Sequence, residues 1–154
     1  MSGYEVLKFL HVAAVIAWVG APVVLTILQA RLRKAGDQAT LMGIGRQMET
    51  IGKIYFSPLA AATLVTGVLM VATTDGLSFG DPWILIGLAG IAATMGIGLG
   101  VIAPLGKKLG EAAQATPPDG AAIASLSQRM TTLTIVNIVI LFFVVWAMVI
   151  KLGL

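Results

Sequence analysis

Four apolar runs of membrane-spanning length dominate this chain and restrict it to one class of fold. They cover roughly residues 5–30, 52–74, 82–105 and 130–151. A helix needs about 20 apolar residues to cross the hydrocarbon core of a bilayer. Because backbone polar groups in lipid must be satisfied within their own segment, each run is expected to form a transmembrane α-helix. We therefore predict an all-α membrane protein, a four-transmembrane-helix up-and-down bundle that makes residues 1–154 a single integral membrane domain.

The composition agrees with this fold and excludes several kinds of partner. Hydrophobic residues make up 58% of the chain and charged residues 11%, whereas about a quarter of an ordinary soluble domain is charged. The net charge of +3 is small and spread over helix ends, so the expected partner is the lipid bilayer and not nucleic acid. The absence of cysteine from the sequence excludes disulfides, thiolate metal sites and iron–sulfur clusters.

The basic residues predict an orientation. Eight of the 10 Lys and Arg residues flank the first and third loops, while only Lys8 and Lys151 lie on the other side, beside a loop that carries Asp75 and Asp81. Loops rich in Lys and Arg stay in the cytoplasm. The first run is also too long for a signal-peptide core. We therefore expect a multi-pass protein of the bacterial inner membrane with both termini in the periplasm.

Two prolines lie inside the predicted helices and are expected to bend them. Pro22 and Pro58 each remove a backbone donor, which leaves one carbonyl of the preceding turn without its helical partner. The segment before the second run, residues 38–52, is more polar, and Glu49 and Lys53 stand at the favourable i,i+4 spacing. We expect this segment to form an amphipathic extension of the second helix that bends near Gly52.

Small residues recur every four positions in the third run, at Ala92, Gly96 and Gly100. Such a seam lets another helix approach closely in a membrane. We expect the seam to serve packing within the fold. The alternative is that it forms the contact of a homodimer or of a larger membrane complex.

The only histidine in the sequence, His11, lies inside the first run, about two turns from its outer end. An ionisable side chain within a membrane helix is by default a candidate for function, and a neutral imidazole is a common ligand of haem iron and copper. At about 100° per residue, His11 shares one helix face with Lys8 and Trp18. We predict that His11 either binds b-type haem or copper, or is a hydrogen-bonded interfacial residue.

The predicted topology places two methionines near the depth of His11, Met70 in the second helix and Met148 in the fourth. Histidine with methionine is a familiar ligand pair for haem iron and for copper, although methionine also fills gaps in apolar cores. Lys8 is expected to meet a haem propionate or a lipid phosphate, or to extend to the headgroups. Trp18 lies too deep for the aromatic belt, so it either lines a pocket or fills the core.

The membrane-embedded residues offer little acid–base chemistry. All seven Asp and Glu residues lie in loops or helix ends, which weighs against a proton-coupled transporter. A single histidine also excludes an HExxH zinc site and a Ser/His/Asp set, so no catalytic residues are predicted. The other polar side chain at depth is Asn137, for which we expect hydrogen bonds to threonines of neighbouring helices, namely Thr63, Thr66 or Thr94.

The spacing Lys8-x-x-His11-x6-Trp18-x-Gly20 resembles a family of small bacterial four-helix membrane proteins related to the membrane domain of the copper-resistance protein D. The third helix of that family tends to start with Trp and end with Pro, as Trp83 and Pro104 do in this chain. The resemblance covers most of the chain and implies a predicted integral membrane protein of four helices.

A more distant similarity is to the integral-membrane protoporphyrinogen oxidase, a haem-binding four-helix protein with the same Lys-x-x-His-x6-Trp spacing. Met48-Glu49 before a proline in the second helix also fits it, but this chain has Gln29 and Arg31 where that family carries a further histidine. Haem would then have His11 as its only matching ligand. We therefore predict haem or copper binding through His11 in the outer leaflet, for electron transfer or metal handling. The alternative is a cofactor-free scaffold or an accessory subunit of a larger membrane complex.

Overall fold

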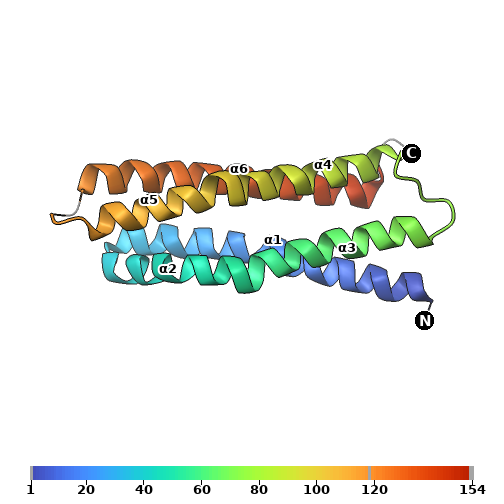
Figure 1. Cartoon of the computed structure of the whole chain (residues 1–154), viewed down its shortest axis with the longest axis horizontal. Helices are drawn as coiled ribbons and strands as arrows, with labels where there is room; N and C mark the ends of the chain where they lie inside the picture. The colour runs from blue at the N-terminus through green and yellow to red at the C-terminus, as the bar shows by residue number, and fades with distance from the viewer. Residues whose placement is uncertain (1, 118, 153–154) are drawn as a thin grey trace.

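The structure, a computed structural model, describes residues 2–117 and 119–152, and all regular structure in this part of the chain is helical. Four long helical spans run antiparallel, with both termini at the same end of the bundle (Figure 1). Each span is long and apolar enough to cross a membrane. The predicted all-α, four-span bundle is thereby confirmed.

The spans are built from helical segments that follow one another along the described chain: α1 (Gly3–Ala35), α2 (Gln38–Ile51), the π-helix η1 (Gly52–Phe56), α3 (Ser57–Thr73), α4 (Pro82–Ile97), the π-helix η2 (Gly98–Ile102), α5 (Ala103–Gln114) and α6 (Gly120–Ile150). The predicted runs fall within these helices to within one residue. All four spans extend beyond the predicted runs at the end opposite the termini, where the sequence is polar enough for a helix to leave the hydrocarbon.

Local hydrogen bonds explain where several of these helices begin and end. At the start of α1, the Ser2 hydroxyl accepts from the Glu5 amide (3.3 Å), and the Glu5 carboxylate accepts from the Ser2 amide (2.8 Å). These reciprocal bonds satisfy two amides at the helix start. Gly36 ends α1 with a φ of 73°, a left-handed conformation that glycine adopts without strain.

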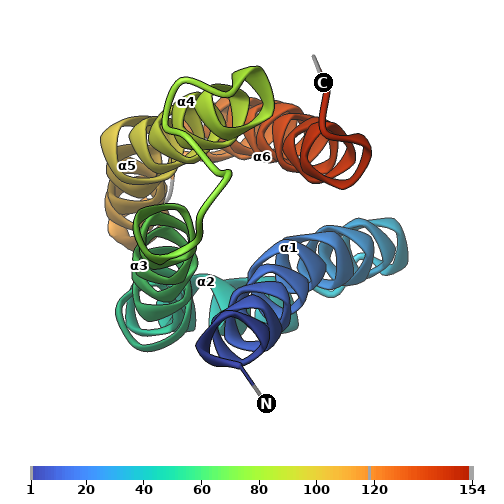
Figure 2. The same ribbon diagram turned by 90° about the vertical axis from the view of Figure 1, so that its right-hand side faces the viewer.

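The spans form two hairpins arranged in chain order around a ring (Figure 2). Helix α1 packs chiefly on α3, while α6 packs on α4 and α5. The hairpins meet through contacts of α1 with α6 and through smaller contacts of α3 with α4 and of α2 with α5. This arrangement gives the bundle two strong interfaces, one inside each hairpin.

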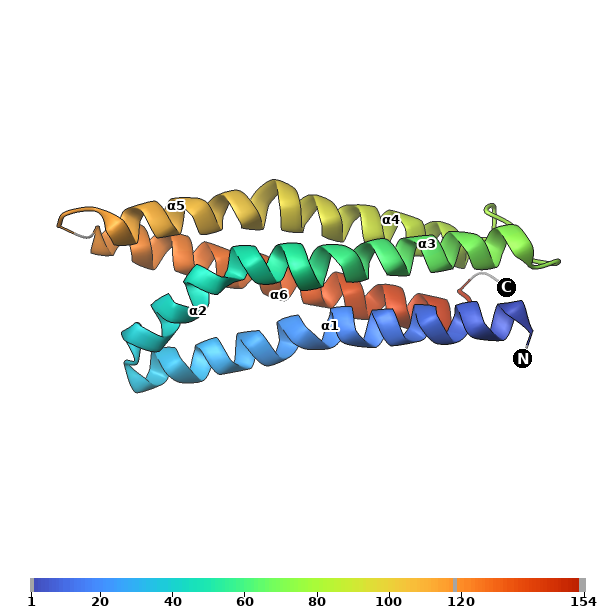
Figure 3. The ribbon, with the colours of Figure 1, turned by 60° about the horizontal axis from the view of Figure 1, so that its bottom comes forward.

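Each π-helix ends two residues before a proline, Pro58 in α3 and Pro104 in α5. In η1 the amide of Ser57 donates to the carbonyl of Gly52, five residues earlier, and η2 has the same pattern. Proline lacks an amide proton and its ring crowds the carbonyl four residues back, so a wider turn at this point accommodates the interruption. The second span bends between α2 and α3 (Figure 3), as predicted near Gly52.

Pro22 has a different outcome from Pro58. Helix α1 continues without a break from Gly3 to Ala35, and the Thr26 hydroxyl donates to the Pro22 carbonyl (2.7 Å). The sequence predicted a bend at both prolines. Within the described helices a change of helix type accompanies Pro58 and not Pro22, and the bend at Pro22 stays a prediction.

The core of the bundle lies at mid-depth, where every span contributes a buried side chain: Trp18 and Val19 from α1, Ala60 from α3, Ile91 from α4 and Leu141 from α6. Trp18 therefore fills the core. His11 lies seven residues before Trp18 in α1, about two turns closer to the end that holds the termini.

The small-residue seam of the third span faces outward. Ala92, Gly96 and Gly100 are exposed, and a Cβ added to Gly96 or Gly100 would meet no atom within 4 Å. The expectation that the seam serves packing within the fold is therefore wrong.

Two other glycines of α4 make the close helix contact instead. A Cβ on Gly87 would overlap the Cε atom of Met148, and a Cβ on Gly90 would overlap Cγ2 of Val144. Because α4 is apolar on every side, the spacing of small residues alone could not show which of its faces turns inward.

Candidate functional site

His11 lies in the interface between α1 and α3, with its ring partly buried. Its Nδ1 atom is 3.0 Å from the Thr63 carbonyl oxygen and 3.1 Å from the Thr66 hydroxyl oxygen. A Cβ placed on Gly67 would come within 3.2 Å of His11 Cε1, so the ring packs directly on the backbone of α3. The imidazole thus faces a neighbouring helix of the bundle and not the lipid.

These contacts fix the tautomer of the imidazole. A carbonyl oxygen can only accept, so Nδ1 must carry the proton that it donates to Thr63. The Thr66 hydroxyl donates its own proton to the Ala62 carbonyl (2.6 Å), which leaves its lone pairs free to accept from Nδ1 as well. Nε2 therefore holds the free lone pair of the neutral ring, and this is the atom that can bind a metal.

Beside the hydrogen bond from His11 to Thr63, a second polar atom has no hydrogen-bond partner in the described part of the chain. Thr63, whose carbonyl accepts from His11, is only 7% exposed, and its Oγ1 atom is buried without a hydrogen bond. A buried hydroxyl in a native interior is nearly always satisfied by protein, water or a bound group. The polar groups around His11 are therefore compatible with a further bound ligand.

The two predicted methionine ligands lie in different interfaces. Met70 is partly buried and follows Thr66 by four residues, so it lies one turn further along the face of α3 that His11 contacts. Met148 packs its thioether on Gly87 of α4. The fold thus associates Met70 with the His11 interface, while Met148 belongs to the α4·α6 contact.

The other two predicted cofactor residues lie apart from the polar contacts of His11. The Lys8 side chain is exposed, with Nζ 6.0 Å from the centroid of the Tyr4 ring. Trp18 belongs to the apolar core at mid-depth. Of the predicted set, His11 alone makes a polar contact between helices.

Asn137 does not make the predicted bonds. Its Oδ1 atom is buried and has no hydrogen-bond partner among the described residues. The Thr66 hydroxyl donates to Ala62 and the Thr94 hydroxyl to Ile91 (3.0 Å). The expectation of a bond to a threonine of another helix is wrong. Thr66 and Thr94 satisfy their hydroxyls on their own helix backbone, and the Thr63 hydroxyl, like Asn137 Oδ1, has no partner among the described residues.

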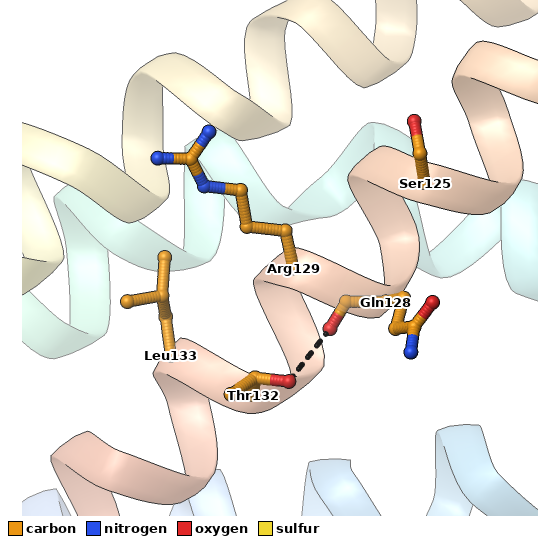
Figure 4. Close-up of a pocket in the computed structure, with 5 residues that line it drawn as sticks. All are labelled: Ser125, Gln128, Arg129, Thr132 and Leu133. Carbon is orange, nitrogen blue, oxygen red and sulfur yellow. Dashed lines mark hydrogen bonds between the residues drawn. The ribbon is translucent and has the colours of Figure 1, made fainter.

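Two surface grooves lie away from His11. An apolar groove runs between α1 and η1, where the Tyr55 hydroxyl donates to the Ala17 carbonyl (2.8 Å). A more polar groove lies on α6 and is lined by Ser125, Gln128, Arg129, Thr132 and Leu133 (Figure 4). Neither groove was predicted, although polar residues at spacings of three and four on α6 are a signal for the second. Among the described residues, no group of three or more His, Cys, Asp and Glu side chains could hold a metal ion.

The end of the bundle opposite the termini is hydrogen-bonded and strongly charged. The predicted ion pair of Glu49 and Lys53 is confirmed, at 2.7 Å, and Arg33 of α1 donates to the Thr131 hydroxyl of α6 (2.8 Å). Between α1 and α2, Asp37 accepts from the Thr40 amide (3.0 Å) and hydroxyl (2.7 Å). Because both bonds favour the carboxylate, they hold the pKa of Asp37 below its ordinary value of 3.8.

Comparison with known proteins shows the family of this chain. The model of the family described as "Predicted integral membrane protein (DUF2269)" matches residues 5–152, nearly the whole chain, and the chain therefore belongs to that family. No curated protein matches the chain significantly, and neither does any solved structure.

Proposed function

We propose that this member of a family of predicted integral membrane proteins uses His11 to bind a redox-active group, either copper or b-type haem, for metal handling or electron transfer. The observation that carries the proposal is the donation from His11 Nδ1 to the Thr63 carbonyl. Metal-bound histidines characteristically donate their other ring nitrogen to a carbonyl or carboxylate, which orients the ring and frees the ligating atom.

Of the two groups, copper agrees better with the described residues. Imidazole and thioether are ligands that copper accepts, with thioether favouring Cu(I), and Met70 lies one turn from Thr66 on the face of α3 that His11 contacts. Haem would need a cavity of several hundred Å³ beside its ligand, whereas a single copper ion would not.

Other residues of the chain would hold and shield the His11 ring that ligates the metal. Thr63 and Thr66 fix the ring orientation, Gly67 leaves room for the ring to pack on α3, and the Trp18 cluster closes the core two turns deeper. Copper, when bound, would supply one-electron chemistry. The chain's contribution would be a ligand whose ring is partly buried and oriented between α1 and α3.

We further propose that the protein lies in a bacterial inner membrane with its termini in the periplasm. The support is the asymmetry of charge: residues 31–53 and 107–129 contain eight Lys and Arg, whereas only Lys8 and Lys151 lie toward the termini. His11 would then lie in the outer leaflet. Accessibility of N-terminal and C-terminal tags from the periplasmic side tests this orientation.

The test of the copper proposal is a Cu(I) titration of the purified protein in detergent against a chromophoric chelator, with a visible spectrum recorded alongside for haem. We expect one Cu(I) per chain, with loss of binding in His11→Ala and weaker binding in Met70→Leu. Met148→Leu is the matched control and should bind as the native protein does. A Soret band that disappears in His11→Ala would identify haem in place of copper.

A native protein that holds no copper and shows no Soret band would contradict cofactor binding altogether. It would favour a second candidate function, a cofactor-free scaffold or accessory subunit. The observation that supports this candidate is the outward face of Ala92, Gly96 and Gly100, which is free to pack against another transmembrane helix. Cross-linking in native membranes tests it, since Gly96→Leu should abolish a dimer or complex formed through this seam.

A further inference from the structure

The polar groove on α6 faces away from the bundle. Met130 of the same segment points to α5, with its Cε 3.9 Å from where a Cβ on Gly106 would lie, and Thr131 accepts from Arg33 of α1. The groove residues lie on the remaining side of α6, and its four polar members are exposed: Ser125, Gln128, Arg129 and Thr132. Figure 4 shows these side chains on the near surface of α6, with α1 and α5 to its sides.

The groove offers a positive charge and hydrogen-bond donors that are free to bind a ligand. The Ser125 hydroxyl donates to the Ala122 carbonyl (3.0 Å) and the Thr132 hydroxyl to the Gln128 carbonyl (3.2 Å), so both protons are already used. The remaining donors are the Arg129 guanidinium and the Gln128 amide. Among the described residues, no carboxylate lies within ion-pair distance of Arg129. The unpaired guanidinium and the adjacent amide donor therefore favour a ligand that supplies anionic oxygen.

The position of the groove along α6 indicates the source of that oxygen. Residues 120–129 of α6 are largely small or polar, whereas the sequence from Met130 onward is strongly apolar. Leu133, which closes the groove on its apolar side, lies one turn beyond Arg129. An outward-facing groove at this transition is level with lipid phosphates. The end of the bundle that carries it is also basic, with eight Lys and Arg and four Asp and Glu in residues 31–53 and 107–129.

We propose that this groove is a binding site for the phosphate headgroup of an anionic phospholipid. Arg129 donates to the phosphate oxygens as a two-pronged fork, Gln128 adds a further donor, and Leu133 contacts the start of an acyl chain. This role is independent of cofactor binding at His11, which lies in another interface of the bundle.

The test is native mass spectrometry of the full chain in a non-ionic detergent, titrated with phosphatidylglycerol or with phosphatidylcholine of the same acyl chains. The native protein should retain phosphatidylglycerol in preference, and Arg129→Gln should lower that retention about fivefold, the effect of one cation near a membrane surface. Lys108→Gln, at the same end on α5, removes an exposed cation outside the groove and should leave the retention nearly unchanged. Circular dichroism establishes that both variants keep their helices.

Three results would overturn the proposal. The first is equal retention of the two lipids by the native protein. The second is a loss in Lys108→Gln as large as that in Arg129→Gln, because binding would then be a general property of this basic end. The third is displacement of phosphatidylglycerol by millimolar inorganic phosphate alone, which would assign the groove to a free anion.

Discussion

The two hairpins of this bundle are held together in different ways. In the α1·α3 hairpin, side-chain hydrogen bonds cross between the helices, from His11 to Thr63 and Thr66 and from Tyr55 of η1 to Ala17. In the α4·α6 hairpin, the contact is made by side chains of α6 that insert against glycines of α4. Ala147 of α6 has no exposed surface, and Ile84 of α4 is only 3% exposed.

This difference shows two ways of holding transmembrane helices together in lipid. Lipid is as apolar as leucine, so burial of apolar surface cannot by itself drive two transmembrane helices together. Close packing on small residues gives a tight contact but provides no polar atoms that could bind a ligand. Hydrogen bonds across an interface also hold it, but they leave polar atoms such as His11 Nε2 and Thr63 Oγ1 available for a ligand. The candidate site therefore lies in the hairpin that uses polar contacts.

The largest loss of stability is expected for Gly90→Ala, which tests the close packing of the α4·α6 hairpin. The added Cβ would overlap Val144, whose branched side chain has few rotamers to move into. We expect a loss of about 1–3 kcal/mol, the usual effect of overpacking, measured by unfolding in mixed micelles of a denaturing and a mild detergent. Gly96→Ala is the matched control, because no atom lies near its added methyl group. Equal stability of the two variants would contradict the packing described for α4 and α6.

The α1·α3 hairpin, which uses hydrogen bonds between its helices, is tested by His11→Leu. This substitution keeps an apolar side chain of similar volume but removes the hydrogen bonds of His11 to Thr63 and Thr66. A hydrogen bond between membrane helices contributes on average about 0.6 kcal/mol and at most about 1–2 kcal/mol. We expect a loss of about 1 kcal/mol in the same unfolding experiment, smaller than that of Gly90→Ala. A variant as stable as the native protein would show that the bonds of His11 do not hold α1 against α3.

A smaller change is expected for Thr66→Val, which removes one of the two acceptors of His11 Nδ1. The carbonyl of Thr63 remains at 3.0 Å, so the ring keeps its orientation and its tautomer. We expect a loss of about 0.5 kcal/mol and unchanged Cu(I) affinity within a factor of two or so. A loss of affinity as large as that in His11→Ala would instead make Thr66 a ligand or a necessary support of one.

The smallest effect concerns Asp37, which lies outside both hairpin interfaces. Its pKa is lower when folded than the 3.8 of the unfolded chain, because Thr40 donates two hydrogen bonds to the carboxylate. The stabilisation of the α2 start is therefore complete above pH 3.8 and is lost as the pH falls through the lower, folded value. The Thr40 amide resonance, followed by NMR, should titrate with a midpoint below 3.8, and Asp37→Asn should abolish that titration. A midpoint above 3.8 would show that the cap does not form.

Local features of the sequence predicted much of this structure. The bend near Gly52, the Glu49–Lys53 pair and the four spans depend on residues close together in the chain, and the structure has all of them. The inward glycines of α4 and the lack of a partner for Asn137 Oδ1 did not follow, since both depend on which face of a helix meets its neighbour.

The sequence by itself determined that the chain crosses a membrane four times and that its single imidazole lies about two turns inside the first helix. Long apolar runs and charged ends are sufficient for that, because lipid tolerates few other structures. Only the tertiary structure decided that His11 faces α3, that Gly87 and Gly90 turn inward, and that Ala92, Gly96 and Gly100 turn outward. A membrane helix that is apolar all round carries no polar stripe to orient it, so shape complementarity between neighbouring helices makes the choice.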